Sequence, residues 1–131
     1  MKLGVAVFLW ATLAFASSQS GPHGGQVVHD PDTTNKFEVK IDPDNGKIQV
    51  YSLRPEIKQP KSMAITLFKD PDNAQTIELK AANPVVNAPP RFEGELGPNA
   101  GSYAGFELKF GLNMKSLRIL PYIPYIPTRQ K

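Results

Sequence analysis

The chain has 131 residues, enough for one ordinary domain and too few for two. It contains no cysteine, which excludes disulfides, thiolate metal sites and a lipid-modified cysteine. Its net charge of +3 is spread along the chain without a basic run, so no nucleic-acid partner is expected.

The first 20 residues have the order of a secretory signal peptide. Lys2 is followed by a nearly unbroken apolar run and then by small residues. The apolar run is shorter than the roughly 20 residues that a transmembrane helix needs. We therefore expect residues 1–20 to be a signal peptide, with cleavage after Ala16, Ser18 or Ser20 left open. The mature protein is expected to be periplasmic, monomeric, without a membrane span and not a lipoprotein.

Apolar and polar residues alternate with a period of two in most of the mature chain, which is the pattern of half-buried strands. No stretch keeps a period of 3.6, and the 13 prolines disfavour long helices. The sequence therefore predicts an all-β fold, a single antiparallel, Ig-like β-sandwich of about seven or eight strands over residues 36–120. The alternation turns Glu38 and Lys40 toward water. The expected strands are 37–42, 48–51, 65–68, 77–80, 106–112 and 117–119, with weaker candidates at 25–29 and 91–96.

Turn residues separate these segments. Asn45-Gly46 lies between two alternating runs, which is a strong hairpin signal because both residues tolerate positive φ. Asp-Pro-Asp occurs at 30–32, 42–44 and 70–72. Carboxylate loops of this kind can bind calcium, but none has the spacing of an EF-hand loop, so we interpret all three as turns.

The two ends of the mature chain lack the alternation. Residues 21–35 are interpreted as an N-terminal arm. Residues 121–131 begin Pro-Tyr-Ile-Pro-Tyr-Ile-Pro, and a proline at every third position favours polyproline II. We expect an extended tail outside the sandwich, which could dock on a partner, fold back over an open sheet edge or remain disordered.

The arm contains the only two histidines of the chain, His23 and His29, with Asp30 beside the second. Imidazole binds zinc and copper well, carboxylates complete such sites, and the glycines after His23 let the backbone turn around an ion. On one straight strand the two histidines would be about 20 Å apart, so a shared ion requires a turn at the glycines. His23, His29 and Asp30 are therefore the predicted metal ligands, the alternative being a flexible arm.

No catalytic constellation is visible. There is no cysteine nucleophile, no serine lies in a nucleophile-elbow pattern, and no glycine-rich loop opens a helix. We therefore predict a protein that is not an enzyme, and whose only cofactor is a divalent ion, copper or zinc.

The stretch Gly-Pro-His-Gly-Gly-Gln-Val-Val at 21–28, followed by Phe-Glu-Val-Lys-Ile at 37–41 and Gly-Lys-Ile-Gln-Val-Tyr-Ser-Leu at 46–53, resembles a small bacterial envelope domain. This is the His-Gly-Gly domain at the front of periplasmic adaptor subunits of heavy-metal efflux pumps, which is also found as stand-alone exported proteins. The resemblance implies a periplasmic metal-efflux accessory in which His23 occupies the position of the family's histidine. The chain has none of the helical hairpin of an adaptor. The alternative is an envelope interaction module that docks a partner through an open sheet edge or the tail.

Overall fold

The computed structural model describes residues 20–96, 103–111 and 117–127. The predicted signal peptide lies outside these ranges except for its last residue. Asn113-Met114, where a short turn is expected between the last two predicted strands, also lies outside them. The described part of the chain is all-β, and it contains no helix of the length and apolarity that crossing a membrane requires.

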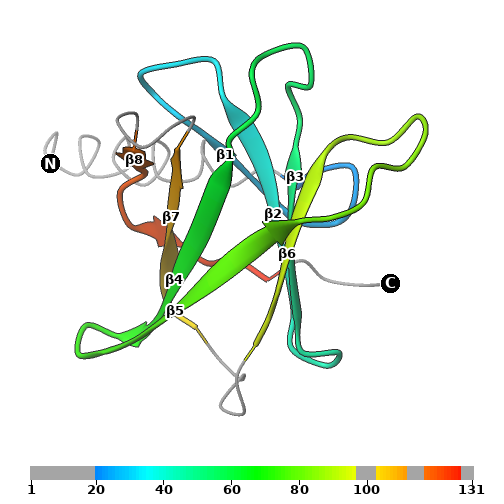
Figure 1. Cartoon of the computed structure of the whole chain (residues 1–131). Helices are drawn as coiled ribbons and strands as arrows, with labels where there is room; N and C mark the ends of the chain where they lie inside the picture. The colour runs from blue at the N-terminus through cyan, green and yellow to red at the C-terminus, as the bar shows by residue number, and fades with distance from the viewer. Residues whose placement is uncertain (1–19, 97–102, 112–116, 128–131) are drawn as a thin grey trace, which may run out of the picture.

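The described strands form a nine-stranded antiparallel sheet in the order β1-β2-β3-β6-β5-β4-β7-β8, with β9 also paired to β7. Figure 1 shows the sheet curling around a common interior, with β5 crossing from β4 toward β6. The strands are β1 (Gln26–His29), β2 (Lys36–Asp42), β3 (Lys47–Ser52), β4 (Ser62–Asp70), β5 (Asn73–Ala81), β6 (Arg91–Glu95), β7 (Gly105–Gly111), β8 (Leu117–Ile119) and β9 (Ile123–Pro124).

The prediction of an all-β antiparallel fold is confirmed. The strand pairing does not show the two separate sheets that the predicted sandwich requires. All strands belong to one sheet curled into a half-barrel. The two halves pair where Lys80 lies opposite Glu93 and Ala81 opposite Phe92. The junction is short because β5 reaches β6 only with its last two residues, and the sheet bends strongly there (Figure 1).

Two of the predicted turns close hairpins as expected. Residues 42–47 connect β2 to β3, and Gly46 has a φ of 67°. The Asp70 side chain closes the β4–β5 turn by accepting hydrogen bonds from Asp72 N at 2.9 Å and Asn73 Nδ2 at 2.7 Å. Both turns use the short polar side chain to bind the backbone or side chain two or three residues on, which is why these residues favour turns.

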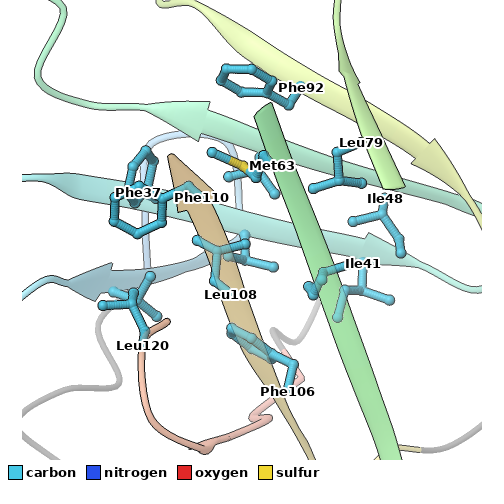
Figure 2. Packing of buried hydrophobic residues seen from close by; sticks show 14 of the residues in the cluster. Phe37, Ile41, Ile48, Met63, Leu79, Phe92, Phe106, Leu108, Phe110 and Leu120 are labelled. Atoms are coloured by element: carbon cyan, nitrogen blue, oxygen red, sulfur yellow. The ribbon is translucent and has the colours of Figure 1, made fainter. Parts of the chain in front are cut away.

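The core lies inside the curl and is built from every second residue of the strands, so the alternation itself selects the buried face. Figure 2 shows the rings of Phe37 and Phe110 next to each other, and their centroids are 5.0 Å apart in an edge-on arrangement. Fully buried members include Phe37, Val39, Ile48, Val50, Ile65, Leu67, Phe106, Leu108, Phe110 and Leu120.

The C-terminal segment 121–127, here called the strap, packs on the domain. Ile123 and Pro124 pair with β7, Tyr125 N–H donates to Ala104 O at 3.0 Å, and Ile123 and Tyr125 pack against the core. The prediction that this tail lies outside the sandwich is therefore wrong for the described residues. The prolines leave enough backbone donors and acceptors for a two-residue edge strand.

Side chains also join the two edges of the sheet. The Gln26 amide on β1 donates to Pro124 O at 2.7 Å, and its oxygen accepts from Ile126 N–H at 3.0 Å. Beyond the end of β1, Asp30 accepts from Arg118 of β8 at 2.6 and 2.8 Å. The residues of the predicted N-terminal arm are thus part of the domain, because β1 pairs with β2 and is tied to the C-terminal strands.

Candidate functional site

Residues 21–25, here called the His-Gly-Gly turn, fold back over the outer face of β2. Gly21 N–H donates to Gly25 O at 2.8 Å, and Gly24 N–H donates to Gly21 O at 3.1 Å. Gly24 has a φ of 81°, which glycine adopts without strain. These two hydrogen bonds close the turn, and Ser20 then pairs with Gln26 across its base.

The turn encloses the carboxylate of Glu38. Oε2 accepts hydrogen bonds from His23 N–H at 2.7 Å and Gly25 N–H at 2.8 Å, and Oε1 lies 2.7 Å from His23 Nδ1. Glu38 is completely buried. The alternation correctly assigns it to the outer face of β2, but the expectation that it faces water is wrong because the turn covers it. A buried carboxylate needs such donors to offset the loss of its hydration.

The close approach of the turn to β2 depends on two of its glycines. A Cβ at Gly21 would lie 2.4 Å from Glu38 Cδ, and a Cβ at Gly25 would lie 2.7 Å from the carbonyl oxygen of Val39. Neither separation is tolerated, so a larger residue would lift the turn off the carboxylate. The glycines therefore serve to bring backbone N–H groups onto Glu38, which differs from the predicted role of folding around an ion.

Tyr51 holds the other side of the histidine. It pairs with Glu38 across β2 and β3, and its ring stacks on the imidazole of His23 with centroids 3.8 Å apart and planes 3° from parallel. Burial raises the pKa of the Tyr51 hydroxyl; Arg91 opposes this rise and Glu38 adds to it. The imidazole is therefore fixed in orientation by a stacked ring and in position by a carboxylate.

This geometry prepares one imidazole nitrogen for an outside ligand. Glu38 contacts Nδ1. When Nδ1 carries the proton, the lone pair of Nε2 is available to coordinate an outside ligand. The His23 side chain is 32% exposed, whereas that of Glu38 is fully buried. A carboxylate on the remote nitrogen of a histidine is the usual support for a metal-binding imidazole, since it sets the tautomer and raises the basicity of the ligating atom.

The structure places the other two predicted ligands elsewhere. His29 is exposed at the end of β1, and its cross-strand neighbour is Lys36, whose positive charge opposes a bound cation. Asp30 is buried and accepts from Arg118, from Asp32 N at 3.0 Å and from Thr33 Oγ1 at 2.9 Å. Both Asp30 oxygens are occupied by these donors, which gives the residue a structural role.

Burial alone would raise the pKa of Asp30, but hydrogen bonds from Arg118, the Asp32 backbone and Thr33 outweigh it and hold the pKa below its ordinary value. The carboxylate is therefore ionised and paired. Within residues 20–96, 103–111 and 117–127, no three histidine or carboxylate side chains come together as a metal-binding group. The predicted set of His23, His29 and Asp30 is thus not assembled, and His23 is joined instead to Glu38 and Tyr51.

Sequence reasoning did not identify Glu38 or Tyr51 as site residues. Each stands in an ordinary alternating strand, and only the pairing of β2 with β3 places them side by side under a turn formed 13 or more residues earlier. Comparison of the chain with protein-family models, curated proteins and solved structures finds no match in any of the three. The resemblance to the His-Gly-Gly domain therefore remains a prediction from the motifs at 21–53.

Proposed function

We propose that the protein is an exported, non-enzymatic accessory of heavy-metal efflux, active in the periplasm after removal of residues 1–20, which binds one copper or zinc ion through His23 Nε2. The observation that carries this proposal is the 2.7 Å contact between His23 Nδ1 and the buried Glu38 carboxylate. The contact orients a partly exposed imidazole with its other nitrogen available, as the second shell of a metal site does.

A single protein ligand suits transfer of an ion better than storage. Tight zinc sites have three or four protein ligands, so an ion on His23 alone keeps most of its coordination positions for water or for groups of another protein. Such an ion exchanges readily onto a partner with more ligands, which is the behaviour expected of a protein that delivers ions to an efflux pump. The resemblance of residues 21–53 to the domain of efflux adaptors supports the same partner.

Calorimetric titration of the purified, chelator-treated protein with zinc and with copper tests this proposal. We expect saturable binding near one ion per chain, abolished in His23→Ala and unchanged in the matched control His29→Ala. Glu38→Gln should weaken binding by roughly 10- to 100-fold. The glutamine oxygen can still accept from the two backbone N–H groups, while its NH₂ faces Nδ1 and drives the imidazole proton to Nε2.

The imidazole ¹⁵N shifts of His23 provide an independent readout of that tautomer change. Affinity no greater than that of a short histidine peptide, or loss of binding in His29→Ala, would refute the proposal. Loss of binding in Glu38→Gln with an unchanged tautomer would show that the carboxylate acts by charge rather than by orientation.

The second candidate function is an envelope interaction module, in which the curled sheet, its halves facing each other as in a sandwich, is a rigid support. The observation that favours it is the edge strand β8, where Leu117 and Ile119 are 56% and 58% exposed. Exposed apolar residues on an unpaired edge suit pairing with another strand. The strap contributes little to this function because it is already packed on β7. A co-purifying protein lost in Leu117→Lys/Ile119→Lys would support this candidate.

A further inference from the structure

A cleft of about 680 Å³ lies where the His-Gly-Gly turn, the β2–β3 turn and the strap meet. The residues that line it include Gly24, Gly25, Asp42, Asp44, Tyr103 and Tyr125. A volume of this size is within the range of small-ligand sites and accommodates a long side chain with its flanking backbone. None of the proposed metal chemistry uses this space.

One wall of the cleft is aromatic. Tyr103 and Tyr125, two of the four tyrosines in the chain, meet edge to face with centroids 6.3 Å apart and planes at 82°. The hydrogen bond from Tyr125 N–H to Ala104 O fixes the backbone of the second ring, so the wall is formed before any ligand arrives. Aromatic faces attract cations through their quadrupole, and this attraction grows with desolvation.

The lining of the cleft carries more negative than positive charge. Among the described residues of the lining, Asp42 and Asp44 carry negative charge and Lys40 carries the one positive charge. The side chain and backbone of Asn45 donate to the Asp42 carboxylate and hold its pKa below the ordinary value, so it is ionised. That charge reaches the aromatic wall, since burial and then the charge of Asp42 raise the pKa of Tyr125.

We propose that this cleft is a docking groove for an extended protein segment that inserts a cationic side chain, arginine above all, toward the tyrosine rings and the Asp42 carboxylate. A guanidinium is planar, stacks on aromatic rings and donates paired hydrogen bonds to carboxylates. The cleft offers both kinds of partner, aromatic rings and carboxylates. The groove opens beside the His-Gly-Gly turn, so a partner bound in it would lie next to His23. The binding itself does not depend on an ion at His23.

Amide NMR titration of the purified protein with N-acetyl-arginine methylamide tests this inference, with the citrulline analogue as a neutral probe of the same shape. We expect saturable shifts at Gly24, Gly25, Asn45 and Tyr125 with the arginine probe and much weaker ones with citrulline. Asp42→Asn removes one carboxylate and should weaken the affinity for the arginine probe by roughly two- to five-fold. The matched control is Asp70→Asn, which changes the equivalent turn carboxylate between β4 and β5 and should leave the affinity unchanged.

A second pair of variants separates the aromatic wall from the fold. Tyr125→Phe keeps the ring and should retain binding, whereas Tyr125→Leu keeps an apolar side chain and should lose it. Equal binding of the arginine and citrulline probes, equal effects of Asp42→Asn and Asp70→Asn, or the absence of saturable shifts around the cleft would each overturn the proposal. Because no metal is added, the result is distinguishable from the fate of the proposed ion site.

Discussion

Glu38 shows how one buried side chain organises the segment around it. Two backbone N–H groups and an imidazole nitrogen surround its carboxylate, and Gly21 and Gly25 are the residues that let them approach. Charged hydrogen bonds of this kind each contribute roughly 1.5–3 kcal/mol to stability, which offsets the loss of hydration of the carboxylate. The same contacts that stabilise the turn also set the orientation of His23.

Two glycine substitutions separate packing from backbone strain. Gly25→Ala should lower the free energy of unfolding by about 2–3 kcal/mol, because its Cβ would overlap the Val39 carbonyl oxygen. Gly46 has a φ of 67° and open space where a Cβ would lie. Gly46→Ala should therefore lower the free energy of unfolding by only about 1 kcal/mol, through backbone strain. Urea denaturation of the three proteins measures both values.

Gly46→Asn is the control for the second site, because asparagine tolerates positive φ and should restore most of the stability. Equal losses in Gly25→Ala and Gly46→Ala would contradict the close packing of the turn on β2. Histidine ¹⁵N shifts in Gly25→Ala should also move, since the displaced turn separates His23 from Glu38.

At the scale of the elements, alternation was a sufficient signal for the long strands and an insufficient one for the ends of the chain. Each of the eight predicted strands has a counterpart, and Asn45-Gly46 marked the β2–β3 hairpin. The strand β9 was missed because proline normally argues against pairing, and it pairs here only as a two-residue edge. The burial of Glu38 was missed because the alternation describes one sheet face and carries no information on what covers it.

The Asp30–Arg118 pair connects elements that lie 88 residues apart in the sequence, the end of β1 and the short strand β8. The Asp30 side chain is buried, whereas that of Arg118 is 35% exposed. The Asp30 carboxylate also organises the Asp-Pro-Asp turn by accepting hydrogen bonds from Asp32 and Thr33. One residue thus holds both a local turn and a long-range contact between sheet edges.

The pH dependence of stability should report this pair. The folded pKa of Asp30 is below its ordinary value of 3.8, so the pair stabilises the protein fully above that value and progressively less as the pH falls through the folded pKa. We expect Asp30→Asn to be less stable than the unsubstituted protein at neutral pH, with the difference narrowing on acidification below pH 3.8. Denaturation at a series of pH values measures it.

Asp72→Asn, which changes an exposed carboxylate in the β4–β5 turn, is the matched control and should show a small difference at every pH. A difference between Asp30→Asn and the unsubstituted protein that stays constant down to acid pH would mean that Asp30 stabilises the fold by shape and not by its charge.

At the scale of the whole molecule, the sheet is closed by side chains and a strap. Gln26 binds two strap residues that follow it by 98 and 100 positions, while β1 and β8 lie at opposite ends of the strand order. Ile123 and Tyr125 of the strap pack against the hydrophobic core. The half-barrel therefore depends on its last described segment for a complete core.

Deletion of residues 121–131 should accordingly destabilise the entire domain. Loss of the partly buried Ile123 and Tyr125 side chains should cost roughly 3 kcal/mol, and the single unfolding transition should move to lower temperature. Differential scanning calorimetry measures the shift. Gln26→Leu, which removes only the two amide contacts, is the milder companion variant and should shift the transition less. A transition unchanged by the deletion would show that the tail is an appendage.

The double contact of Gln26 also determines how the protein presents its ends. Ser20 pairs with the backbone of Gln26, and Pro124 and Ile126 bind its side chain, so the first and last described residues meet around one amino acid. Anything attached to either end, whether a tether, a fused domain or a surface, would approach the molecule from the same side.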